Sequence, residues 1–94
     1  MKIKVLKFGG TSVGSIGAIK RSADIIHDWS KKTKVIAVLS AMSGETDRLI
    51  NLTKSFSKNP NPIDCDNAIS SGENVSCALM SLCLNNHKIK AKSL

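Results

Sequence analysis

The sequence predicts an α/β fold built on a parallel sheet. Short apolar runs alternate with segments whose apolar residues recur every three or four positions. The expected order of elements is strand, helix, strand, helix, helix, strand, which is typical of parallel strands covered by helices. A chain of 94 residues makes at most one domain. We therefore expect residues 1–94 to form a single partial domain, the truncated start of a three-layer αβα sheet covered on both faces.

The first strand is expected over residues 2–8, where apolar residues face both sides. Two glycines follow it, and Ser15 is a suitable N-cap for a helix that ends near Ser30. One face of this helix is expected to be apolar through Ile16, Ile19, Ala23, Ile26 and Trp29.

The second strand is expected at Val35–Leu39, an uninterrupted apolar run of the kind found in strands buried on both faces. A right-handed crossover from the first strand places Gly9–Gly10 and the polar segment 40–47 at the same edge of the sheet. These two loops should therefore face one another.

A second helix should follow, with Thr46 or Asp47 as its cap. Its apolar stripe is expected to comprise Leu49, Leu52, Thr53 and Phe56. Residues 57–62 contain two prolines and predict a short connection that does not separate domains.

A third helical segment begins at Ile63. We expect it to be interrupted at 70–73, because a glycine within a helix costs roughly 1 kcal/mol relative to alanine unless it allows a close approach or a kink. Residues 88–94 alternate in polarity and predict a third strand.

The charge balance is basic, with 14 Lys and Arg against 7 Asp and Glu, a formal net charge of +7. Nucleic-acid binding is one explanation. However, the lysines are scattered, and neither an arginine cluster nor a platform of aromatic residues accompanies them. Solvated lysines together with an anionic small ligand explain the balance as well, and we expect no nucleic-acid partner.

The cysteines Cys65, Cys77 and Cys83 form no Cys-x-x-Cys pair and no zinc-type spacing with His27 or His87. We expect reduced thiols, a cytoplasmic protein and no metal-binding side chains. The sequence has no signal-peptide-like apolar region and no run long enough to cross a membrane.

The segment Gly9–Ser12 joins a strand to a helix, a junction whose free backbone N–H groups bind anions. It matches neither the P-loop nor the dinucleotide-binding pattern. Two interpretations stay open: a phosphate cradle, or a tight turn in which glycine supplies a positive φ. Lys7 is accordingly either a clamp on a transferring phosphoryl group or an ordinary lysine at a strand end.

Ser40, Thr46 and Asp47 can be explained as caps of the second helix. Glu73 can be an ordinary helical glutamate. Its position beside Gly72, at the expected helix break, also suits a carboxylate that faces the ammonium group of a ligand.

Four motifs taken together resemble the N-terminal part of the aspartokinases, within the amino acid kinase family. They are Lys-Phe-Gly-Gly-Thr-Ser-Val at 7–13, Val-Leu-Ser-Ala-Met at 38–42 with Thr-Asp-Arg-Leu at 46–49, Ser-Gly-Glu-Asn-Val-Ser at 71–76, and Ala-Lys-Ser-Leu at 91–94. The resemblance covers essentially the whole chain. It implies a carbamate kinase-like fold and the ATP- and Mg²⁺-dependent phosphorylation of the L-aspartate β-carboxylate, the first step towards lysine, threonine and methionine.

The resemblance also implies roles for individual residues on the nucleotide side. Lys7 would neutralise charge on the transferring phosphate. Phe8, Gly9 and Gly10 would line the ATP phosphate site, and Ser40 would lie between the nucleotide and the substrate.

On the substrate side, the resemblance implies that Thr46 and Asp47 belong to the aspartate-binding loop and that Glu73 holds the substrate ammonium group. The chain departs from the family here. Glu45 stands where the family usually has threonine, and it adds a negative charge near two anionic substrates.

Family members continue into further strands, an adenine pocket and regulatory ACT domains, none of which is expected within these 94 residues. The resemblance therefore leaves two hypotheses. Either the segment works within a complete kinase, or with a complementary chain or a second copy of itself, or it is an inactive split-gene remnant or an interaction piece.

Overall fold

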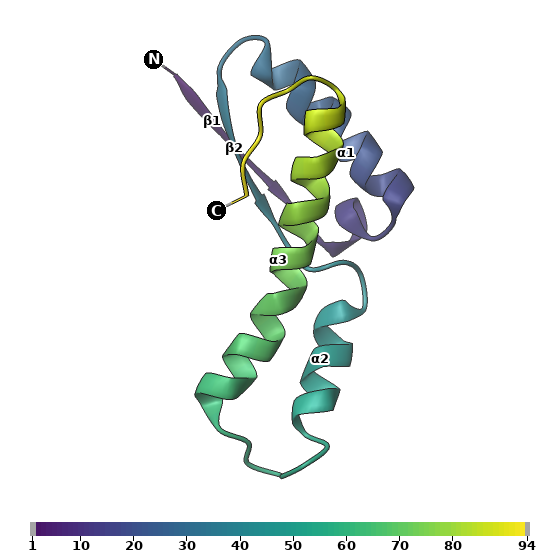
Figure 1. Cartoon of the computed structure of the whole chain (residues 1–94), viewed down its shortest axis with the longest axis vertical. Helices are drawn as coiled ribbons and strands as arrows, with labels where there is room; N and C mark the ends of the chain where they lie inside the picture. The colour runs from purple at the N-terminus through teal and green to yellow at the C-terminus, as the bar shows by residue number, and fades with distance from the viewer. Residues whose placement is uncertain (1, 94) are drawn as a thin grey trace.

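The computed structural model describes residues 2–93. Its elements, in chain order, are β1 (Ile3–Phe8), the 3-10 helix η1 (Gly10–Val13), α1 (Ile16–Ser30), β2 (Lys34–Leu39), α2 (Glu45–Thr53) and α3 (Pro62–Asn86). The molecule is elongated, 49 × 28 × 17 Å, because α2 and the first half of α3 form an arm that projects from the sheet (Figure 1).

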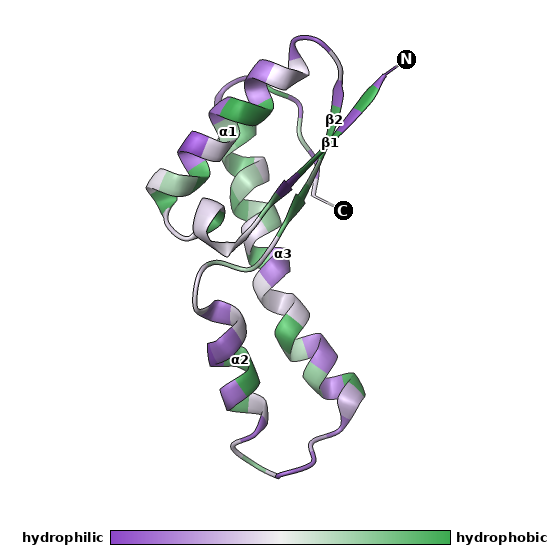
Figure 2. Cartoon of the chain, turned by 180° about the vertical axis from the view of Figure 1, so that it is seen from behind, coloured by the Kyte–Doolittle hydropathy of each residue, from purple (hydrophilic) through white to green (hydrophobic). Residues whose placement is uncertain are grey.

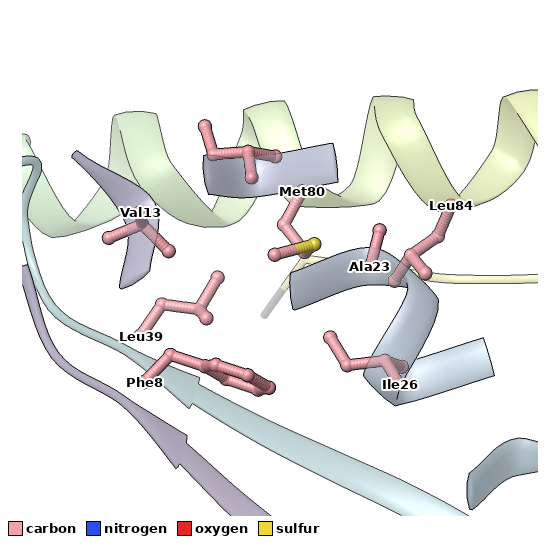
Figure 3. Close-up of a cluster of buried hydrophobic side chains, with 8 residues drawn as sticks. Phe8, Val13, Ala23, Ile26, Leu39, Met80 and Leu84 are labelled. Atoms are coloured by element: carbon pink, nitrogen blue, oxygen red, sulfur yellow. The ribbon is translucent and has the colours of Figure 1, made fainter. Parts of the chain in front are cut away.

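The sheet consists of β1 and β2, which pair in parallel from Ile3 opposite Lys34 to Phe8 opposite Leu39. Helices α1 and α3 pack together on one face of this sheet. Figure 3 shows their buried side chains meeting those of the strands. The core comprises Phe8, Val13, Ile19, Ala23, Ile26, Leu39, Met80 and Leu84. The predicted α/β class and the parallel crossover are confirmed.

The opposite face of the sheet is open to solvent. Its apolar side chains are about half exposed, and exposure alternates along β1, where hydrophobic and hydrophilic residues both occur (Figure 2). These side chains are Ile3, Val5, Ile36 and Val38. The prediction that Val35–Leu39 is buried on both faces is wrong for residues 2–93, because α1 and α3 both cover the same side.

Helix α1 has the predicted bounds and the predicted cap. The Ser15 Oγ accepts a hydrogen bond from the Ala18 N–H at 3.1 Å. The middle of the expected stripe is buried, but Ile16 at its start is 58% exposed and Trp29 at its end is 38% exposed. The Lys4 ammonium lies 4.4 Å from the centre of the Trp29 ring, a cation–π contact at the rim of the core.

Helix α2 is shorter than expected and is capped differently. Its N-cap is Gly44, at a left-handed φ of 80°, so Thr46 and Asp47 lie in the first turn and do not cap the helix. The helix ends at Thr53, and Phe56 is 96% exposed in the connection that follows. The prediction of Phe56 as part of the apolar stripe is therefore wrong.

Helix α3 runs without interruption through the predicted break at 70–73. Asn61 caps it, with its Oδ1 accepting hydrogen bonds from two backbone N–H groups of the first turn, and Pro62 occupies the first helical position. Gly72 is buried in the middle of the helix. Close approach, rather than a kink, is thus the physical reason for this glycine.

The expected third strand is not formed by residues 88–93, and Leu94 lies outside the described residues. After α3 the chain reverses at Lys88, which has a φ of 63°. The Asn85 side chain then exchanges hydrogen bonds with the backbone of Ala91. Ile89 and Ala91 pack against the core, so the segment returns alongside the sheet without joining it (Figure 1).

Between residues 2 and 93, no helix combines the length and the apolar character that crossing a bilayer requires.

Candidate functional site

The glycine loop after β1 and the loop after β2 are in direct contact at the carboxyl edge of the sheet. A Cβ built on Gly10 would lie 3.2 Å from the Ala41 carbonyl oxygen, and one built on Gly14 would lie 3.2 Å from the Ser43 Cβ. The Ser40 N–H donates to the Phe8 carbonyl at 3.0 Å. The prediction that these two loops face one another is confirmed.

The core and α1 together hold the glycine loop in place. Val13, the last residue of η1, is fully buried. The hydroxyl of the buried Ser22 donates to the Ser12 carbonyl at 2.7 Å. A phosphate site needs backbone donors in fixed positions, and these two anchors fix the loop that carries them.

Neither Gly9 nor Gly10 has a positive φ. Gly9 is extended, with a φ of −77°, and among residues 2–93 the one glycine in the left-handed region is Gly44. The interpretation of this loop as a turn that needs glycine for its positive φ is therefore wrong. At Gly10 the absence of a side chain is required by the nearby Ala41 carbonyl, and at Gly9 the space is open.

Lys7 and Phe8 point to opposite faces of the sheet. The Phe8 side chain lies in the core, so only its backbone is available to line a phosphate site. Lys7 is exposed beside Val38 at the carboxyl end of β1, and within residues 2–93 it forms no ion pair. Its ammonium therefore remains available for an anion at this edge.

Thr46 and Asp47 are exposed in the first turn of α2. Between Gly44 and these residues, Glu45 forms an ion pair with Arg48, whose Nε donates to the Glu45 Oε2 at 3.1 Å. The hydrogen bonds from the Arg48 side chain, together with its positive charge, hold the pKa of the Glu45 carboxyl below its usual value. The negative charge that Glu45 adds is thus offset locally.

Glu73 is exposed on α3, directly after Gly72. Gly72 lies against the second loop and α2, since its built Cβ would be 3.0 Å from the Ala41 Cβ and 3.1 Å from the Leu49 Cδ1. The glycine loop, the segment after β2 and the middle of α3 thus converge, although α3 is not broken there.

Sequence reasoning missed two features of this site. The first is Gly44 as the left-handed cap, which its place just before a helix could have indicated. The second is the partner of Glu45, and Arg48 at i+3 was a readable signal.

No group of three His, Cys, Asp or Glu side chains is placed to hold a metal ion within residues 2–93. The glycine loop offers backbone N–H groups and hydroxyls, Lys7 adds an exposed ammonium group at the end of β1, and α2 and α3 carry the exposed carboxylates of Asp47 and Glu73. It is suited to hold a polyanion next to a group that carries an amine.

Comparison with known proteins decides the family. The model of the amino acid kinase family matches residues 2–94. The chain belongs to this family.

The sequence is similar to curated aspartokinases over its full length. It is 45% identical to the aspartokinase of Geobacillus stearothermophilus over 100% of this chain, and 45% identical to that of Helicobacter pylori over 96%. It spans 23% and 22% of the length of these two relatives. The resemblance to aspartokinases that the motifs indicate is therefore confirmed over the length of this chain, which is less than a quarter of these relatives.

Two solved structures share the fold. The aspartate kinase from Synechocystis superimposes on 90% of this chain and 15% of its own, with a TM-score of 0.83 and 41% identity. E. coli aspartokinase III in complex with aspartate and ADP covers 97% of this chain and 30% of its own, with a TM-score of 0.80 and 25% identity. The amino acid kinase fold predicted from the sequence is confirmed.

Proposed function

We propose that this chain supplies the phosphate-binding half and part of the substrate-binding half of an aspartate kinase site. The reaction is the transfer of the γ-phosphoryl group of ATP to the β-carboxylate of L-aspartate, which gives 4-phospho-L-aspartate and ADP. The observation that carries the proposal is the packing of the glycine loop, the loop after β2 and α3 against one another through Gly10, Ala41 and Gly72. Similarity to an aspartokinase that was solved with aspartate and ADP supports it.

On the nucleotide side, the chain would act by positioning and by charge. Gly9, whose side-chain position is open, lets the ATP phosphates approach the backbone closely, Gly10 lines the site through its backbone, and the loop N–H groups donate to the phosphate oxygens. Lys7 places a positive charge where negative charge spreads over the transferring group. Phe8 contributes its backbone, and Ser40 is tied to it through the hydrogen bond between the two strand ends.

Mg²⁺ suits this site as a companion of ATP. It binds proteins through one or two carboxylates plus substrate phosphates, and residues 2–93 present no closed cage of ligands. When bound, the ion neutralises charge on the phosphates. The chain's own part is to hold those phosphates against the glycine loop.

On the substrate side, the exposed first turn of α2 would receive aspartate. The Thr46 hydroxyl would donate a hydrogen bond to the substrate, and Asp47 would help to shape the loop. The Glu73 carboxylate would accept hydrogen bonds from the substrate ammonium group. The β-carboxylate oxygen of aspartate attacks the γ-phosphorus while the bond to the β-phosphate bridging oxygen breaks, and the electron pair of that bond leaves with ADP.

The proposal includes a contribution from outside these residues. The chain spans 23% of the length of the Geobacillus relative, and the sheet exposes an apolar face through Ile3, Val5, Ile36 and Val38. We propose that further aspartokinase residues, in the same polypeptide or in a complementary chain, cover this face and complete the site. The enzyme would act in the synthesis of lysine, threonine and methionine, and the free thiols of the three cysteines fit the reducing cytoplasm.

The same exposed face favours a second candidate, a segment that is inactive alone and binds another chain through this surface. The two candidates differ in what they predict for ATP and aspartate.

A chimeric enzyme separates them. The chimera is the Geobacillus aspartokinase with its matching segment replaced by this chain, whose full length aligns with that segment. Aspartate-dependent formation of ADP is expected, together with aspartate β-hydroxamate when added hydroxylamine displaces phosphate from the aspartyl phosphate. A chimera that melts cooperatively and still forms neither product contradicts the proposed function.

A further inference from the structure

Ala41 lies between two glycines that belong to different segments. On one side, its carbonyl oxygen lies 3.2 Å from the position of a Cβ on Gly10, and on the other its methyl group lies 3.0 Å from that of a Cβ on Gly72. A Cβ at either glycine would thus lie closer to Ala41 than ordinary van der Waals contact allows. Ala41 itself is 4% exposed. The glycine loop and α3 are therefore spaced by a single small residue.

Ala41 has little freedom to move. The residue before it donates a hydrogen bond to Phe8 at the end of β1, at 3.0 Å, and the carbonyl of Met42 after it accepts one from the Glu45 N–H at 2.9 Å. Its methyl group is attached directly to this fixed backbone. The other near neighbours of that built Cβ are side-chain atoms not attached directly to the backbone, the Leu49 Cδ1 at 3.1 Å and the Glu45 Cγ at 3.4 Å. A side chain at position 72 would therefore displace α3 from Ala41.

We propose that Gly72 is a positioning residue that sets the distance between Glu73 and the phosphate-binding edge of the sheet. Glu73 follows Gly72 directly on a continuous helix, so a displacement of α3 moves its carboxylate as well. This inference rests on the proposed function, in which Glu73 receives the ammonium group of aspartate. In this inference Gly72 sets how closely α3 approaches Ala41, and Glu73 makes the contact with the ammonium group of aspartate.

The first test is Gly72→Ala in the chimeric enzyme described above. A shift of the Glu73 carboxylate by a few tenths of an ångström should raise the KM for aspartate up to about tenfold. The scale is taken from the loss of roughly 10²-fold in rate that a misplacement of 1 Å causes. The KM for ATP should change less than about twofold, because the glycine loop is held by Val13 and Ser22. The matched control is Gly17→Ala on α1, where the nearest atom to the new methyl group is the mobile end of Arg21 at 3.4 Å.

The second test is rescue. Ala41→Gly removes the methyl group that a side chain at position 72 would meet. The KM for aspartate of the double variant Gly72→Ala/Ala41→Gly should therefore return most of the way to that of the unsubstituted chimera. The same change should not rescue Gly10→Ala, because the atom that crowds position 10 is the Ala41 carbonyl oxygen, which Ala41→Gly retains. A role limited to stability would lower the melting temperature and leave the aspartate KM unchanged.

A double-mutant cycle on the 94-residue chain itself separates this inference from the proposed function. Urea unfolding of Gly72→Ala, Ala41→Gly and the double variant should show that the two substitutions are coupled. Additive effects, or an aspartate KM in an active chimera that does not respond to Gly72→Ala, overturn the inference. An unsubstituted chimera without activity counts against the proposed function alone, and the cycle still tests the contact.

Discussion

Replacement of Val13 by alanine should weaken the anchor of the glycine loop. Val13 is fully buried at the end of η1, within the core shared by the strands, α1 and α3. The substitution removes about two CH₂ equivalents, at about 0.8 kcal/mol each, and leaves a cavity that adds a further cost. We expect the free energy of unfolding to fall by about 2–3 kcal/mol, and the melting temperature of a chain of this size to fall by at least about 8 °C.

Urea unfolding followed by circular dichroism measures this loss, and hydrogen exchange of the Ser12 amide, which donates to the Gly9 carbonyl, measures the loosening of the loop. The matched control is Ile16→Ala, at a residue that is 58% exposed, where the change should stay within about 0.5 kcal/mol. Equal losses for the two variants would refute the assignment of Val13 as the anchor.

Two further predictions concern the arm formed by α2 and α3. Asn61→Ala should cost about 1 kcal/mol in urea unfolding, because it removes the side chain that caps the first turn of α3, and a change below about 0.3 kcal/mol would speak against this cap. Arg48→Gln should raise the pKa of the Glu45 carboxyl towards its ordinary value, measured by NMR titration of its side-chain carbon. Because the folded pKa of Glu45 is depressed, the pair stabilises the fold above the unfolded pKa, and this contribution is lost as the pH falls through the folded pKa. An unchanged titration curve in Arg48→Gln would contradict the pairing.

The sheet-forming half of the fold could be predicted because its pattern is local. Val35–Leu39 is continuously apolar, and Ser15 precedes a regular helical stripe, so the strand–helix–strand unit and the meeting of its two loops follow from general rules. What a local pattern does not contain is which elements share a face. Both helices pack on one side of the sheet, and Ile36 therefore remains half exposed.

The errors in the arm have a common cause. The low helix propensity of glycine predicts a break at Gly72, whereas α3 is continuous and the nearness of Ala41 and Leu49 leaves no room for a side chain there. Phe56 matched a helical stripe, but α2 had already ended at Thr53. At Gly72 the outcome depends on tertiary packing, and at Phe56 it depends on where α2 ends.

The prediction of a strand over residues 88–94 is wrong for residues 88–93 for a different reason. The alternation of residues 88–94 was present, but strand pairing also needs a matching backbone partner. In residues 88–93 the backbone of Ala91 bonds with the Asn85 side chain instead. Lys7, the penultimate residue of β1, and Ser40, directly after β2, lie at the edge where the two loops meet, as a parallel crossover predicts.

The role of Lys7 tests the central claim most directly. In the chimeric enzyme, Lys7→Ala should lower the turnover number by about 10²-fold or more, the scale expected when one preorganised charge is removed from a transferring group. Lys34→Ala is the matched control, because Lys34 is an exposed lysine at the start of β2, opposite Ile3 and away from the loops. A turnover number that falls for Lys7→Ala and not for Lys34→Ala is the predicted result. Equal turnover in the two variants would contradict the assignment of this edge of the sheet as the phosphoryl-transfer site.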